Sequence, residues 1–284
     1  MRSTRNPQGG PVPQSQENTP TQSNRPDSAV GGVPRRTVIG DDDLKRMLSQ
    51  NKPSFLQRNA GCMVTLVLIA LNVAVYAVEV LLSGMRVDVS TQVLVEMGAM
   101  YAPLVRSAAD LYRFVTPMFL HMDLMHLAFN MVALYSVGEV LERTLGKGWF
   151  VALYFVGGIT GNAVSYAADV FLGSGASVSA GASTSVFGLF VAVALLGVLH
   201  RGNRSVFAQY SKGMLGVIAV NVAYTLLVPG ISVSGHLGGA LGGAAAMLML
   251  PARSLRVPVV VRVVVAVAWA GALGWLLVSR GLIG

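Results

Sequence analysis

Seven long apolar stretches, separated by shorter polar segments, constrain the fold of this chain more than any other feature. Hydrophobic residues make up 53% of its 284 residues and charged residues only 12%, and the mean hydropathy is +0.60. This composition excludes an ordinary soluble domain and is typical of a protein that crosses a membrane several times. We therefore expect an all-α, polytopic membrane helix bundle. Its predicted spans cover about residues 61–83, 124–141, 149–172, 183–200, 213–229, 235–251 and 258–279.

Loop charges predict the orientation of these spans. The loops after the third and fifth stretches carry no lysine or arginine, whereas the loops after the second, fourth and sixth are basic. Positive loops stay in the cytosol, so the N-terminus is predicted to be cytosolic and the C-terminus outside. The second, fourth and sixth stretches then begin on the extracellular or lumenal side. The basic loop residues are Arg143, Lys147, Arg201, Arg204, Lys212, Arg253 and Arg256.

The N-terminal segment differs from the rest of the chain. Residues 1–40 are rich in Pro, Gln, Asn, Ser, Thr and Gly, and are expected to be disordered. The acidic run at 41–43 precedes Leu44 and Met47, which favours either a short interfacial helix or a solvated turn. Arginine and serine in this tail are compatible with a mitochondrial presequence, but its first 28 residues offer almost no apolar helical face.

The net charge of +8 is not read as a nucleic-acid signal. Nine of the 21 lysines and arginines lie in the first 60 residues, and most others lie in short loops. This distribution indicates membrane topology and contact with lipid headgroups rather than one basic face for nucleic acid. The single cysteine, Cys62, cannot form an internal disulfide; it is interpreted as an inert apolar residue, with lipidation as the alternative.

Two further features indicate a cavity on the outer side. The loop between the first two stretches is about 40 residues long and unusually apolar, so part of it is expected to lie in the outer leaflet against protein. Several inner stretches are shorter than the roughly 20 residues of a straight crossing. Short spans favour local thinning of the bilayer or helices that begin below its surface.

Three polar residues lie in the first turn of alternate stretches: His126, Ser183 and His236. Alternate spans begin on the same side, so these groups can meet at one depth. A serine hydroxyl needs a base before it becomes a good nucleophile, and His236 is the candidate base for Ser183. Gly239 and Gly243, four residues apart, form a small face that lets two helices approach closely. The alternative role of Ser183 is to cap the helix that follows it, and that of His236 is to form a structural hydrogen bond.

His126 and Asn130 are four residues apart and lie on one helical face. Their N–H groups are suitable donors to a developing oxyanion, although a polar clasp between helices would use the same residues. His121 is interpreted as structural and His200 as interfacial. Since no acid lies near the outer ends of the fourth and sixth stretches, we expect a Ser–His dyad without a third acidic member.

Together these motifs resemble the rhomboid family of intramembrane serine proteases, over about residues 61–251. By that resemblance Ser183 is the nucleophile and His236 the general base, with no metal or organic cofactor. His126, Asn130 and the Ser183 amide would form the oxyanion hole, for which Gly181 leaves room. The motifs are His121-x4-His126-x3-Asn130, Gly181-x-Ser183, His236-x2-Gly239-x3-Gly243, Gly138-x3-Glu142-x3-Gly146 and Tyr112-Arg113.

The resemblance also assigns supporting residues and shows two departures. Phe187 matches an aromatic ring that packs on the catalytic histidine, and Arg113 and Glu142 would brace the first loop and a helix end. Thr184 follows the nucleophile where the family pattern has glycine, so it would crowd the serine or alter helix packing; similar variants occur in protozoan parasites. Tyr112 stands where tryptophan is common.

The implied organisation has three parts: a disordered cytosolic tail at 1–60, a six-span rhomboid core at 61–251, and a linker with a seventh span at 252–284. An added C-terminal span resembles rhomboids of the eukaryotic secretory pathway and cell surface, whereas the mitochondrial type carries its extra span in front. The compartment expected is therefore the secretory pathway or plasma membrane, with the active site facing outside.

The function implied is hydrolysis of single-span transmembrane proteins within or just outside their membrane segment. The expected partners are such substrates and the lipid bilayer. The first alternative is a rhomboid-like pseudoprotease that binds or traffics membrane proteins, with Thr184 blocking the site. The second is a transporter or channel that uses His126, Asn130 and His236 as a relay, but intramembrane acids and an inverted repeat are not evident.

Overall fold

The computed structural model describes Asp42 and residues 59–173, 177–227 and 231–283. All the predicted spans lie within one compact unit of the chain, Pro53–Gly284. The tail and the predicted interfacial helix at its end lie outside the described residues, except for Asp42, which is helical and exposed. The division into tail, core and extra span stays a prediction.

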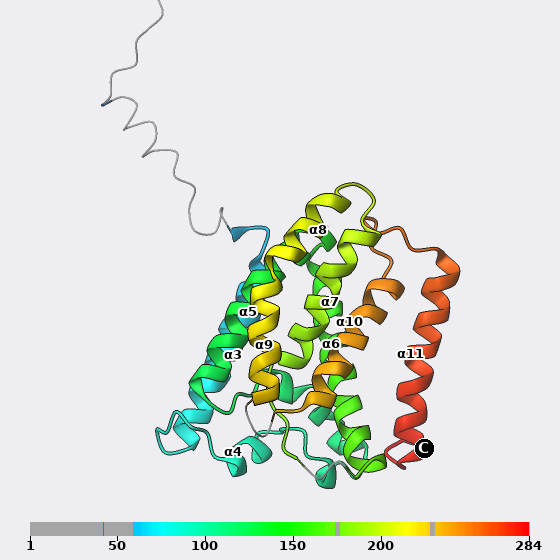
Figure 1. The fold of residues 1–284 in the computed structure, drawn as a ribbon. Helices are drawn as coiled ribbons and strands as arrows, with labels where there is room; N and C mark the ends of the chain where they lie inside the picture. Colours follow the sequence, from blue (N-terminus) through cyan, green and yellow to red (C-terminus); the bar gives the residue numbers. More distant parts are fainter. Residues whose placement is uncertain (1–41, 43–58, 174–176, 228–230, 284) are drawn as a thin grey trace, which may run out of the picture. The chain divides into compact units, whose positions relative to one another are not determined.

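The described part of the chain is built from helices, with two isolated β-bridges and no strand among its described residues. This confirms the predicted all-α bundle (Figure 1). The long helices are α3 (Met63–Leu82), α5 (Leu124–Leu145), α6 (Lys147–Phe171), α7 (Ser183–Leu199), α8 (Arg204–Gly213), α9 (Leu215–Leu227), α10 (Val233–Met249) and α11 (Val259–Ser279).

These helices differ in their ability to cross a bilayer. Four of them, α3, α5, α6 and α11, are long and apolar enough to span it. Helices α8 and α9 would make a fifth span if counted together, since they meet at a 46° bend. Helices α7 and α10 are apolar but have only 17 residues each. The protein is thus an integral, multi-pass membrane protein, and the count of six plus one spans stays a prediction.

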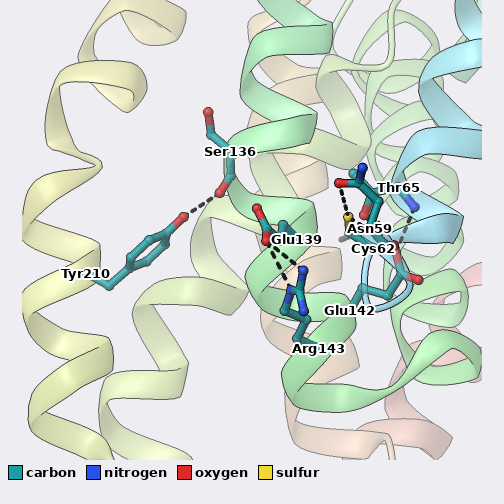
Figure 2. A network of polar contacts seen from close by, with 8 residues as sticks. All are labelled: Asn59, Cys62, Thr65, Ser136, Glu139, Glu142, Arg143 and Tyr210. Carbon is teal, nitrogen blue, oxygen red and sulfur yellow. Dashed lines mark hydrogen bonds and ion pairs between the residues drawn. The ribbon is translucent and has the colours of Figure 1, made fainter. Parts of the chain in front are cut away.

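Helix α8 occupies a segment that the sequence analysis treated as a loop. Its Phe207 and Tyr210 pack against the main apolar core, and the Tyr210 hydroxyl donates to the Ser136 carbonyl of α5 (Figure 2). These two aromatic contacts tie α8 to the bundle, so the chain continues as helix before it bends into α9.

Glycines bring α10 into close contact with α7. A side chain at Gly239 would overlap the Thr184 carbonyl, and one at Gly243 would overlap the backbone of Gly188. Helix α6 packs against both α7 and α10, and α11 lies at the edge of the bundle beside α10 (Figure 1). The absence of side chains at these positions therefore lets the backbones of α7 and α10 approach closely.

The first loop folds as a short helix, α4 (Thr91–Glu96), followed by the 3₁₀ turns η1 (Ala102–Leu104), η2 (Ala108–Phe114) and η3 (Thr116–Phe119). Buried Arg113 donates from Nη1 to the carbonyls of Val95 and Ala99, at 3.0 and 2.9 Å. Asn162 of α6 donates to the Phe114 carbonyl at 2.9 Å. Three backbone carbonyls of this loop thus accept hydrogen bonds from buried side chains.

Glu142, near the end of α5, caps the beginning of α3. Its carboxylate accepts from the backbone amides of Val64 and Thr65, at 2.9 and 2.8 Å, and from the Thr65 hydroxyl at 2.9 Å. Figure 2 shows the Glu142 and Thr65 side chains meeting between the two helices. The first amides of a helix have no partner within it, so this buried carboxylate fastens α3 to α5.

Candidate active site

Ser183 and His236 meet where α7 and α10 begin. The Ser183 hydroxyl oxygen lies 2.6 Å from Nε2 of His236, although the two residues are 53 positions apart. Ser183 is the first residue of α7, and His236 lies in the first turn of α10, which the Ser232 side chain caps by accepting from the Gly235 amide. Both side chains are buried, with 7% and 5% of their surface exposed. A hydroxyl and an imidazole in this geometry can exchange a proton directly.

Two side chains contact the ring of His236, one on its face and one at its edge. Phe187, one turn after Ser183, stacks on it at a centroid distance of 4.3 Å and an angle of 7°. Nδ1, the nitrogen on the other side of the ring, lies 2.8 Å from the Thr225 hydroxyl of α9. The second contact was missed by the sequence analysis, which looked only for an acid as a third member.

Gly181 provides space between the serine and His126. Its φ of +138° lies in a region that favours glycine. A β-carbon there would come within 2.7 Å of His126 Cε1 and 3.1 Å of the Ser183 hydroxyl oxygen. The Gly181 amide donates to the Pro117 carbonyl at 2.8 Å, which holds this turn against the first loop. An oxygen atom beside Ser183 would therefore face the imidazole of His126.

His126 and Asn130 lie together on α5. Asp123 caps this helix by accepting from the His126 amide at 2.8 Å, and the His126 ring stacks near Tyr224 of α9 at 5.9 Å. The Asn130 side chain donates one hydrogen to the His126 carbonyl at 2.9 Å, which leaves its second amide hydrogen for another acceptor. Both residues are 2% exposed.

Residues 108–253, about half of the chain, match the sequence profile of the family described as Rhomboid domain. The chain belongs to the rhomboid family. It is 32% identical over 211 residues to Rhomboid protease GluP of Bacillus subtilis (strain 168), covering 73% of this chain and 39% of that protein. It is 30% identical to Rhomboid-like protease 3 of Toxoplasma gondii (61% and 64% covered) and 30% identical to Rhomboid protease AarA of Providencia stuartii (63% and 69%).

This rhomboid spans less than two thirds of the length of the first relatives it matches, as its 39% coverage of GluP illustrates. The matched region contains each of the polar residues placed at the site, from His121 to His236, together with Arg113 and Glu142. The family assignment predicted from the sequence motifs is thus confirmed.

Thr184, the departure from the family pattern, packs against glycines of two neighbouring helices in this rhomboid. Its side chain lies against Gly161 of α6 and Gly235 of α10, where added β-carbons would come within 2.7 and 3.4 Å of Thr184 side-chain carbons. The threonine therefore fills a space that Gly161 leaves open. It thus takes part in the packing between α6, α7 and α10.

His121 is fully buried beside the site, and its ring meets the His126 ring edge-on at 5.2 Å. Its backbone amide donates to both carboxylate oxygens of Glu79 in α3, at 3.1 and 3.2 Å. Glu79 was missed by the sequence analysis. This contact anchors the end of the first loop to α3, immediately before the helix that carries His126.

Proposed function

We propose that this rhomboid is an intramembrane serine protease that uses Ser183 and His236 as a catalytic dyad. The observation that carries the proposal is the 2.6 Å contact between the Ser183 hydroxyl and Nε2 of His236, at the beginning of two short apolar helices. The named relatives are rhomboid proteases, which supports the same class of reaction.

In this mechanism Ser183 attacks the carbonyl carbon of a peptide bond while His236 accepts the hydroxyl proton. The resulting oxyanion faces His126, Asn130 and the backbone amide of Ser183. As the first residue of α7, Ser183 has an amide without an acceptor inside its own helix. The imidazolium then protonates the leaving amine, and a water activated by the same ring hydrolyses the acyl-enzyme.

We further propose that the substrates are single-span membrane proteins, cleaved in or near the outer half of their membrane segment. Three features support this: the dyad lies in the first turn of α7 and α10, the basic loops alternate along the chain, and irregular backbone of the first loop is packed beside the site. The N-terminus would be cytosolic, and the protein would belong to the secretory pathway or plasma membrane.

The alternative, a pseudoprotease that binds or traffics membrane proteins, depended on Thr184 blocking the site. The Thr184 side chain instead faces Gly161 and Gly235, and the hydroxyl and imidazole remain in contact. These observations favour the protease.

The test is cleavage of a single-span reporter by the purified chain in liposomes. We expect the wild type to cleave, Ser183→Ala to lose cleavage and fluorophosphonate labelling, and Ser136→Ala to keep both. Ser136 is a matched control because it is a membrane-helix serine whose hydroxyl bonds its own helix at Val132. Binding of the reporter without cleavage, equal in wild type and Ser183→Ala, would instead support the pseudoprotease.

A further inference from the structure

Helix α9 buries its polar residues. Of its 13 mostly apolar residues, the two that are buried are Asn221 and Thr225, which lie one helical turn apart. Polar side chains are costly in lipid, so a membrane helix turns them towards the interior of the bundle, where they usually have partners on neighbouring helices. The partner of Thr225 is the His236 ring, at 2.8 Å.

The hydrogen bonds around Thr225 determine which nitrogen of His236 carries the proton. The Thr225 hydroxyl has a single hydrogen and lies 2.7 Å from the Asn221 carbonyl, which can only accept. With its hydrogen donated there, the Thr225 oxygen accepts from the Nδ1–H of His236. Nε2 then carries the lone pair, and it faces the Ser183 hydroxyl.

The Phe187 ring alone does not define this arrangement. Stacking at 7° restricts the tilt of the imidazole, but it still allows the ring to shift within its own plane and to flip about the Cβ–Cγ bond, which exchanges each nitrogen with a ring carbon. A hydrogen bond at Nδ1 removes both freedoms because it fixes one edge of the ring. Thr225 occupies the place that a carboxylate takes in a Ser–His–Asp triad, without contributing a charge.

We propose that Thr225 is the positioning residue of the catalytic histidine: its hydroxyl holds the His236 ring in the orientation and tautomer that let Nε2 act as a base toward Ser183. The proposal rests on the proposed protease function for its effect on rate, whereas its effect on the tautomer is independent of activity. Because Thr225 belongs to α9 and His236 to α10, displacement of α9 would release the ring.

The variants that test this are Thr225→Val, which keeps the shape and removes the hydroxyl, and Thr225→Ser, which keeps the hydroxyl. Thr144→Val is a matched control, since the Thr144 hydroxyl also bonds its own helix, at the Val140 carbonyl, but lies at the far end of α5. We expect Thr225→Val to lower kcat about tenfold to a hundredfold with KM unchanged, and to slow fluorophosphonate labelling of Ser183 by the same factor. Thr225→Ser should restore most of the rate.

The second measurement is a ¹⁵N spectrum of the histidine-labelled full chain, with the His236 signals assigned by their loss in His236→Ala. We expect a protonated Nδ1 and an unprotonated Nε2 in the wild type, and a mixture of tautomers in Thr225→Val. A wild type with the proton on Nε2, or a Thr225→Val variant that labels and cleaves at the wild-type rate, overturns the proposal. A wild type that neither labels nor cleaves, but whose tautomer changes in Thr225→Val, supports the positioning role and refutes the protease.

Discussion

Replacing Gly181 by alanine tests whether the space between Ser183 and His126 is needed for activity. An added β-carbon would lie 2.7 Å from His126 Cε1, about 0.7 Å inside the ordinary contact limit of 3.4 Å. Because the His126 ring is buried and packed by His121 and Tyr224, it has little room to retreat. The same β-carbon would also lie 3.1 Å from the Ser183 hydroxyl oxygen, within the space that the oxyanion needs.

Displacing a reacting or stabilising group by close to 1 Å costs about a hundredfold in rate, and losing one oxyanion donor costs about 10²–10³ in kcat. We therefore expect Gly181→Ala to lower kcat at least about a hundredfold and to change KM by less than about threefold. The small change in KM is expected because the added methyl group disturbs the reacting centre and not the surface that binds the rest of the substrate. The assay is cleavage of the single-span reporter in liposomes, with the rate of fluorophosphonate labelling as the second readout.

Two control variants at other glycines distinguish steric contact at the site from the effects of backbone strain or of an added methyl group alone. Gly84 also has a positive φ, +70°, but no atom lies within 4 Å of an added β-carbon, so Gly84→Ala adds backbone strain alone. Gly148 has open space around it and no positive φ, so Gly148→Ala adds a methyl group alone. Both should cleave at nearly the wild-type rate. Gly181→Ala with wild-type kcat would refute the assignment of His126 and its neighbourhood to the oxyanion.

Two other variants test the packing around the site. Glu142→Ala removes the acceptor of two amides and one hydroxyl of α3, so the free energy of unfolding should fall by about 2–4 kcal/mol, seen as a lower Tm in detergent, while Ser183 still labels at low temperature; an unchanged Tm would contradict the capping role. Thr184→Gly leaves a space facing Gly161 and should lower stability by about 1–3 kcal/mol with labelling unchanged. Labelling that rises tenfold would instead mean that Thr184 crowds the nucleophile.

Local patterns of the sequence predict much of this architecture. Apolar stretches predict membrane helices because the backbone has no other partner in lipid, and each of the seven predicted stretches overlaps an observed helix. His126, Ser183 and His236 lie in the first turns of the second, fourth and sixth stretches. Because alternate spans begin on the same side of the membrane, the sequence predicts that the three residues lie at a similar depth. Glycines four residues apart predict close helix contact because they lie on one helical face and have no side chains. The order of the motifs is specific enough to indicate the rhomboid family.

Only the tertiary structure decided which way each side chain turns. Hydropathy sets the depth of a residue but not the rotation of its helix, so the contact between Thr225 and His236 could not be read from a threonine in an apolar stretch. The same holds for Thr184, whose direction depends on a glycine in α6, and for Glu79 and Glu142, which bond backbone amides 42 and about 77 positions away. These contacts join distant segments, and they exist only once the helices have packed.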